Sequence, residues 1–261
     1  MIDFEDGRVS VRLSETTYYV LQQDVAAFCF LNNDGSYNEN GFYNAILPLL
    51  HLKRTRERER LRKILEKRFG DKVRPEFKDE IFYELDDVFN LVKFDDKKTK
   101  YHQAKIDIRL SKENMQLFSE MFSVLALRKI PKSTYIRSLL NQYTTLRTDE
   151  REYLCYSKQY DELTKIIEDE YAVEYYDGVS QEILFPLVID LCCYNNEFYV
   201  IGIAFEAKKV ILKSYRLCEF KKYKVHCTDR KIGESFLDKA EEIVSDFLYY
   251  EKPEWYLGEK E

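Results

Sequence analysis

Two short segments of the chain carry charged or polar side chains at every second position. The segments are RVSVRLSE at residues 8–15 and KIDIRLSK at residues 105–112. Because side chains alternate between the two faces of a strand, each segment predicts a strand with one apolar and one polar face. The polar residues are Arg8, Ser10 and Arg12 in the first segment, and Lys105, Asp107 and Arg109 in the second. The four cations of such a face could bind phosphate groups.

Each of these strands is followed by the signals of two helices, so the first part of the chain contains an internal repeat. Ser14 and Ser111 are predicted to cap helices at about 15–30 and 112–127, since a serine oxygen accepts an unpaired N–H at a helix start. A second helix follows in each copy, in NGFYNAILPLL and in STYIRSLLNQY. The repeats are predicted at about 8–61 and 105–154, with an acidic helix at 75–92 between them.

The order of strand, capped helix and second helix resembles the ribbon-helix-helix family. In that family two strands pair into an antiparallel ribbon, helices cover its back, and its front enters the major groove of DNA. With both units in one chain, the resemblance implies an intramolecular pseudo-dimer. It also implies that nucleic acid contacts the six polar residues of the ribbon. Ser133, at the start of a second helix, would anchor a backbone phosphate.

Two positions depart from this family pattern. Asp107 would repel phosphates, unless it reads the amino group of a cytosine. Asn40 and Gly41 stand in the first copy where the second copy has Ser133. The alternative to nucleic-acid binding is that the ribbon serves only as a folding or dimerisation scaffold.

The later part of the chain consists of short apolar runs broken by turn signals, which indicates a small, strongly bent antiparallel sheet or barrel. Three strings resemble the WYL family, namely Phe185-Pro186-Leu187, Phe198-Tyr199-Val200 and Tyr215-Arg216-Leu217. This resemblance implies an Sm-like β-barrel whose basic pocket binds a nucleotide or a single-stranded nucleic acid. The residues implied are Tyr199, Lys208, Lys209, Lys213, Ser214 and Arg216.

Two alternatives apply to this second region. The tyrosines could be core residues, and the lysines could protect an edge strand from aggregation. The literal string Trp255-Tyr256-Leu257 follows a proline and is predicted to lie outside any strand. An amphipathic helix at 233–250 is predicted before it.

Charge and composition exclude several classes of protein. The net charge is −6, but basic residues gather at 53–68, 97–112 and 206–231. For 53–68 the open alternatives are a solvated helix and a nucleic-acid contact. The glycines form neither G-x-G nor a P-loop, and the six cysteines and three histidines have no metal-site spacing. No cofactor, metal site or membrane span is predicted. A nuclease is a third alternative, but acidic pairs such as Asp86-Asp87 and Asp95-Asp96 are adjacent residues, which seldom converge on one metal.

The sequence thus predicts an α+β protein that is not an enzyme and is cytoplasmic. Its expected parts are a tandem ribbon-helix-helix domain at 1–155, a WYL domain at 156–228 and a C-terminal helical segment at 229–261 for dimerisation. This combination resembles the WYL-domain accessory proteins of type VI-D CRISPR systems. The resemblance implies a homodimer that binds single-stranded RNA (or DNA) and stimulates a CRISPR effector ribonuclease. The alternative is a ribbon-helix-helix transcription regulator whose WYL domain senses a nucleotide or a single strand.

Overall fold

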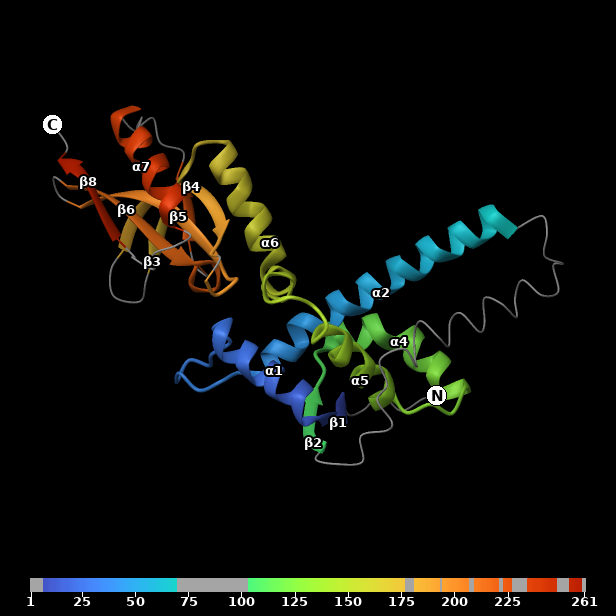
Figure 1. The fold of residues 1–261 in the computed structure, drawn as a ribbon. Helices are drawn as coiled ribbons and strands as arrows, with labels where there is room; N and C mark the ends of the chain where they lie inside the picture. Colours follow the sequence, from blue (N-terminus) through green and yellow to red (C-terminus); the bar gives the residue numbers. More distant parts are fainter. Residues whose placement is uncertain are drawn as a thin grey trace. The chain divides into compact units, whose positions relative to one another are not determined.

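The computed structural model describes most of the chain, in two compact units (Figure 1). The first unit comprises Met1–Leu146 and the second Arg147–Glu261. The described residues are 7–69, 103–176, 181–192, 194–206, 209–220, 223–226, 234–247 and 254–259. The predicted acidic helix at 75–92 and the acidic pairs of the nuclease alternative lie outside them.

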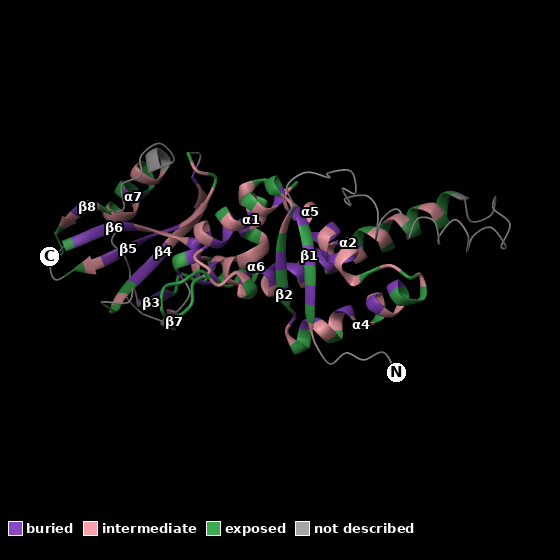
Figure 2. Cartoon of the chain, turned by 90° about the horizontal axis from the view of Figure 1, so that it is seen from below, coloured by how far each residue is buried: buried purple, intermediate pink, exposed green. Residues whose placement is uncertain are grey.

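The first unit is built on a two-stranded antiparallel ribbon of β1 (Arg8–Ser14) and β2 (Gln103–Arg109). Burial alternates along both strands, as Figure 2 shows. The apolar residues Val9, Val11, Leu13, Ile106 and Ile108 are buried. The period-two pattern therefore predicted both the strands and the faces that they bury.

Helices cover the back of this ribbon. They are α1 (Glu15–Ala27), α2 (Glu39–Phe69), α4 (Lys112–Leu127) and α5 (Lys132–Tyr143). Both predicted caps are confirmed: Ser14 Oγ accepts from the N–H of Thr17 at 3.1 Å, and Ser111 Oγ accepts from that of Asn114 at 3.2 Å.

Helix α2 continues through Pro48, whose ring removes one backbone donor from the helix. The carbonyl left without its usual partner is that of Asn44, four residues earlier. The side chain of Asn114 on α4 donates to this carbonyl at 2.9 Å. A hydrogen bond between helices thus replaces the missing one within the helix, and α2 extends over 31 residues.

The second unit starts with α6 (Thr148–Glu168), which changes direction at the non-helical Tyr156. An antiparallel sheet follows, in the order β7-β3-β4-β5-β6-β8. Its strands are β3 (Ala172–Tyr176), β4 (Gln181–Leu191), β5 (Phe198–Glu206), β6 (Lys209–Arg216), β7 (Tyr223–His226) and β8 (Glu254–Glu259). A 3-10 turn, η2 (Leu217–Glu219), follows β6, and α7 (Glu234–Phe247) precedes β8.

Each face of this sheet is covered by a helix. Leu163 and Ile166 of α6 pack into one apolar cluster with Val173, Leu184 and Val200. Ala240 of α7 belongs to a second apolar cluster, with residues such as Ile201, Ile203 and Leu212. The central strands therefore have long apolar runs, as expected for strands buried on both sides.

The expected closed barrel is not formed, because the two end strands β7 and β8 are not paired with each other in the described sheet. The sheet bends at a bulge between Pro186 and Val188, where proline cannot donate a ladder hydrogen bond. Gly202 lies opposite Pro186, and a Cβ there would come within 2.5 Å of the carbonyl oxygen of Phe185. The sheet is therefore bent but open, and helices cover the faces that a closed barrel would bury.

The prediction for Trp255-Tyr256-Leu257 was wrong. These residues lie in β8, which pairs antiparallel with β6. Leu257 is buried in the cluster beneath α7, whereas Tyr256 on the other face is 60% exposed. A preceding proline removes one donor only, so it does not prevent an edge strand from starting at the next residue.

Candidate nucleic-acid interface

The front of the β1–β2 ribbon gathers the six polar residues predicted for it. All six are exposed, and they face each other in pairs across the strands. The pairs are Arg8 with Arg109, Ser10 with Asp107, and Arg12 with Lys105. Four cations and one carboxylate share this face, which gives it a net charge of 4 − 1 = +3. We call these six residues the ribbon face.

Asp107 lies at the centre of the ribbon face and binds the cations around it. Its carboxylate accepts from Arg8 Nη2 at 2.9 Å and from the hydroxyl of Ser10, and Lys105 Nζ lies at 3.9 Å. The hydrogen bonds from Ser10 and Arg8 hold the pKa of Asp107 below its ordinary value. The carboxylate is therefore ionised at neutral pH, where it orients Arg8 and Lys105 without cancelling the positive charge of the face.

Helix α5 packs against β1 and carries the proposed phosphate anchor in its first turn. Ser133 is the second residue of α5 and is half-buried. Pro131 at the N-cap makes no side-chain hydrogen bond to the first turn. The positive end of the helix dipole is thus not capped by a side chain there.

The equivalent helix start in the first copy is used within the protein. Asn40 accepts from the N–H of Arg109 at 2.8 Å and donates to its carbonyl at 3.1 Å. Asn44 donates to the same carbonyl at 2.9 Å and accepts from the N–H of Ser111 at 2.7 Å. The two asparagines bind the end of β2 to α2. Sequence reasoning missed this role, for which two asparagines spaced i, i+4 at a helix start were the signal.

Several of the residues implied by the WYL resemblance are partly buried and have partners within the protein. Tyr199 and Arg216 are opposite each other on β5 and β6, and both are partly buried. Arg216 Nη2 forms an ion pair with Glu197 at 2.8 Å. The hydroxyl of Tyr199 accepts from Asn195 at 3.0 Å, and burial raises the pKa of this tyrosine. Ser214 is half-buried on β6.

The lysines of this group separate into different environments. Lys209 is exposed at the start of β6, and Lys208 lies outside the described residues. Lys213 was expected on the surface, but it is buried, with Glu182 at 2.8 Å, Glu206 at 2.6 Å and Glu254 at 3.5 Å. Three carboxylates surround one ammonium, so Lys213 has no charge to offer a phosphate.

Burial and the neighbouring glutamates act on the pKa of Lys213 in opposite directions. Burial by itself would lower it, but hydrogen bonds to Glu182 and Glu206 outweigh burial and raise the pKa above its ordinary value. Tyr215 donates to Glu182 at 2.5 Å and completes the cluster. We call Lys213 with its three glutamates the lysine cluster, and it joins β4, β5, β6 and β8.

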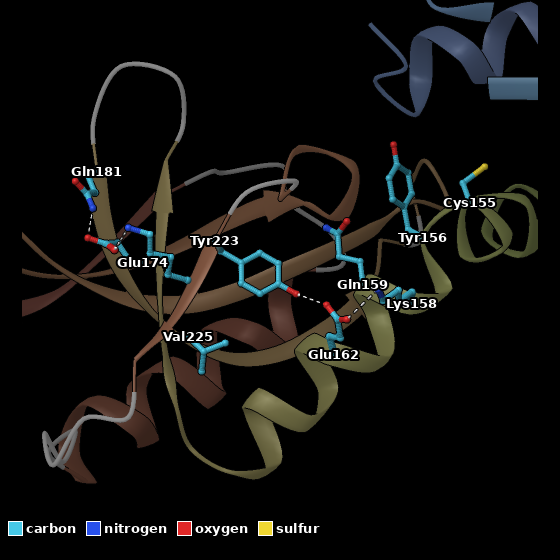
Figure 3. Close-up of a pocket in the computed structure, with 10 residues that line it drawn as sticks. Cys155, Tyr156, Lys158, Gln159, Glu162, Glu174, Gln181, Tyr223 and Val225 are labelled. Carbon is cyan, nitrogen blue, oxygen red and sulfur yellow. Dashed lines mark hydrogen bonds and ion pairs between the residues drawn. The ribbon is translucent and has the colours of Figure 1, made fainter. Parts of the chain in front are cut away.

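A groove of about 950 Å³ lies in the second unit between α6 and the β3–β7 end of the sheet (Figure 3). Its charges are paired: Lys158 lies 3.9 Å from Glu162, and Lys224 lies 3.9 Å from Glu174. The hydroxyl of Tyr223 donates to Glu162 at 3.2 Å. This balance of two lysines and two glutamates does not favour a polyanion. The lining residues are Cys155, Tyr156, Lys158, Gln159, Glu162, Glu174, Gln181, Tyr223, Lys224 and Val225.

Among the described residues, no three His, Cys, Asp or Glu side chains come together as a metal site. Among them, too, none of the helices has the length and apolar character that crossing a membrane requires.

Comparison with solved structures finds a similar fold. No family model and no curated protein matches the sequence. The fold is similar to the crystal structure of a CRISPR Cas-related protein, with a TM-score of 0.62 and 15% sequence identity. The match covers 92% of this chain and 71% of that one. At this identity, the likeness concerns the fold.

Proposed function

We propose that this chain is a non-catalytic accessory protein of a CRISPR system, which binds single-stranded RNA and stimulates an RNA-guided ribonuclease. The observation that carries the proposal is the ribbon face, with its four exposed cations and net charge of +3. The fold shared with a CRISPR Cas-related protein supports the biological setting. The ribbon-helix-helix and WYL resemblances in the sequence support the same class.

The chemistry of the ribbon face suits a sugar–phosphate backbone. Outward residues on one strand are about 7 Å apart, because the rise is about 3.4 Å per residue. A single strand can place its phosphates on such positions, since base pairing does not fix its backbone. Contacts of this kind position nucleic acid without reading its sequence. We therefore expect binding that depends strongly on salt and weakly on sequence.

Binding is tested with a fluorescent single-stranded RNA and a duplex DNA at the same salt concentration. The variant Arg12→Gln with Arg109→Gln removes two ribbon cations. It should weaken RNA binding by about 25-fold at 0.1 M salt, because each single-strand phosphate contact contributes about 0.7 log unit per decade of salt. The matched control is Lys158→Gln with Lys224→Gln, which removes the same charge from exposed positions of the groove.

Equal affinity of the two double variants would reject the ribbon face as the interface. Stimulation is measured separately, as the rate at which the guided effector cleaves its target RNA with and without the chain. The chain alone, in magnesium, should leave the RNA intact. Cleavage by the purified chain would contradict the non-catalytic assignment.

A second candidate function has a specific observation in its favour. β1 and β2 pair over their whole length, and a two-stranded ribbon of this kind fits the major groove of DNA. A ribbon-helix-helix regulator would prefer duplex to single-stranded RNA and would depend on sequence. The binding comparison above separates the two functions.

The proposed assembly is a homodimer, and the WYL-like residues are a second proposed contact. For the homodimer, light scattering of the purified chain measures the mass directly.

For the contact, a phosphate would have to replace Glu197 as the partner of Arg216. Tyr199 lies opposite Arg216 and would share this contact, whereas Lys209 lies opposite Glu206 at the other end of the β5–β6 pair.

A further inference from the structure

Helix α2 changes character at Arg54. Up to that point one face of the helix is buried, with Phe42, Ile46 and Leu50 in the core. From 55 to 68 none of its side chains is buried. In Figure 1 the first half of α2 lies beside α4 and α5, and its second half extends past them.

Arg54 belongs to the basic segment of the sequence but not to its surface. It is 2% exposed and donates to Ser138 Oγ at 2.7 Å and to Gln142 Oε1 at 2.7 Å. These bonds from α2 to α5 hold the last packed turn of the helix. The basic segment of 53–68 therefore divides into one buried arginine and an exposed remainder.

Four cations of the exposed half lie along a single line on the helix. Arg56, Arg60, Lys63 and Lys67 are all exposed, and their spacing is four, three and four residues. At 100° per residue, this spacing places them within about 60° of one another around the helix axis. They span about 16 Å, with neighbours about 4.5–6 Å apart along the axis. We call these four residues the α2 stripe.

The acidic residues of this half lie outside the α2 stripe. Glu66 is on another face, where Arg62 Nε lies 3.2 Å from its carboxylate. Glu57 and Glu59 lie on either side of the stripe by the same helical spacing. No member of the stripe forms an ion pair with any of the described residues. The stripe thus presents four positive charges to solvent.

We propose that the α2 stripe binds the phosphate backbone of a nucleic acid, in addition to the ribbon face. This inference rests on the proposed function and extends its site to another element. Four exposed cations in line match a linear array of phosphates. A protein partner is less suited, because interface cores are depleted of lysine and need apolar anchors. The apolar Leu61 and Leu65 lie on the far side of the helix from the stripe, and the exposed Ile64 at its border is a single apolar side chain.

The test compares two variants of equal charge. Arg60→Gln with Lys63→Gln removes two stripe cations, and Arg58→Gln with Arg62→Gln removes two cations from the other face. Glutamine has nearly the helix propensity of arginine and lysine, so both variants should keep the helix and the Tm of the parent. The stripe variant should bind single-stranded RNA about 25-fold more weakly at 0.1 M salt, and the control within about threefold of the parent.

The outcomes separate this inference from the proposed function. If the stripe variant binds RNA like its control while the ribbon variant is weakened, the stripe inference is overturned and the proposed function stands. Weakening by the stripe variant alone supports the stripe and removes the ribbon face from the interface. If the parent binds neither RNA nor duplex DNA, both fail. If the stripe variant keeps its RNA binding but loses the binding of an acidic protein, the inference is also overturned.

Discussion

At the scale of single residues, the cations of this protein differ in whether other groups of the chain already bind them. Arg54 and Lys213 are buried, and the chain itself supplies their hydrogen-bonding partners. Arg216 is paired with Glu197 and is 25% exposed. Arg12 and Arg109 are exposed and form no ion pair with the described residues. Cations of the last kind keep their full charge for a phosphate, which supports the proposed interface on the ribbon face.

The lysine cluster makes a prediction about stability. Lys213→Met would leave Glu182, Glu206 and Glu254 facing one another without a cation. Breaking a buried pair in this way costs about 3–5 kcal/mol, and the exposure of two of the glutamates places the loss near the lower end. Thermal unfolding should show a clear fall in Tm. Lys209→Met, at the exposed start of β6, is the control and should change the Tm little.

The same variant tests whether Lys213 belongs to the interface. At a temperature where Lys213→Met is still folded, its RNA affinity should equal that of the parent. A fall in affinity with an unchanged Tm would mean that Lys213 contacts the nucleic acid. The description of the lysine cluster as structural would then be wrong.

At the scale of elements, the position of β2 depends on α2. Asn44 hydrogen-bonds the carbonyl of Arg109 and the N–H of Ser111, and its own carbonyl accepts from Asn114. Asn44→Ala would leave the first two groups without these partners, at about 1 kcal/mol for each hydrogen bond. We expect a loss of about 2–3 kcal/mol in the free energy of unfolding, measured by urea denaturation. Asn33→Ala, in the exposed loop before α2, should cost less than 0.5 kcal/mol.

Asn44→Ala should also weaken RNA binding modestly, since it loosens the strand that carries Lys105, Asp107 and Arg109. Unchanged stability would show that water replaces the asparagine at no cost, and that α2 does not hold the ribbon in register.

The sequence predicted the elements whose pattern is local. The alternation in 8–15 and 105–112 predicted two strands and their exposed faces, which the structure has at Arg8–Ser14 and Gln103–Arg109, and the serines predicted two helix starts. Closure of the sheet could not be predicted, because no local pattern shows whether the two end strands β7 and β8 pair with each other. The burial of Lys213 was hidden for another reason. From Val210 to Lys213 four successive residues of β6 are buried, so alternation carried no information there.

At the scale of the whole molecule, a net charge of −6 does not prevent binding of a polyanion. Charges farther apart than about 8 Å are largely screened at physiological ionic strength. A phosphate at the ribbon face therefore responds to the four cations and one carboxylate around it rather than to acidic residues elsewhere. Local charge decides the contact, and the net charge influences solubility.

This reasoning gives a quantitative prediction for the dependence of binding on salt. For single strands the slope of log K against log salt is about −0.7 for each phosphate contact. The four cations of the ribbon face alone would give a slope of about −3, and the ribbon face with the α2 stripe would give about −6. Titrations of the parent with one RNA between 50 and 300 mM salt measure the slope. A value near −6 that becomes shallower by about 1.4 in Arg60→Gln with Lys63→Gln supports both contacts, whereas a slope near zero would mean that neither binds phosphate.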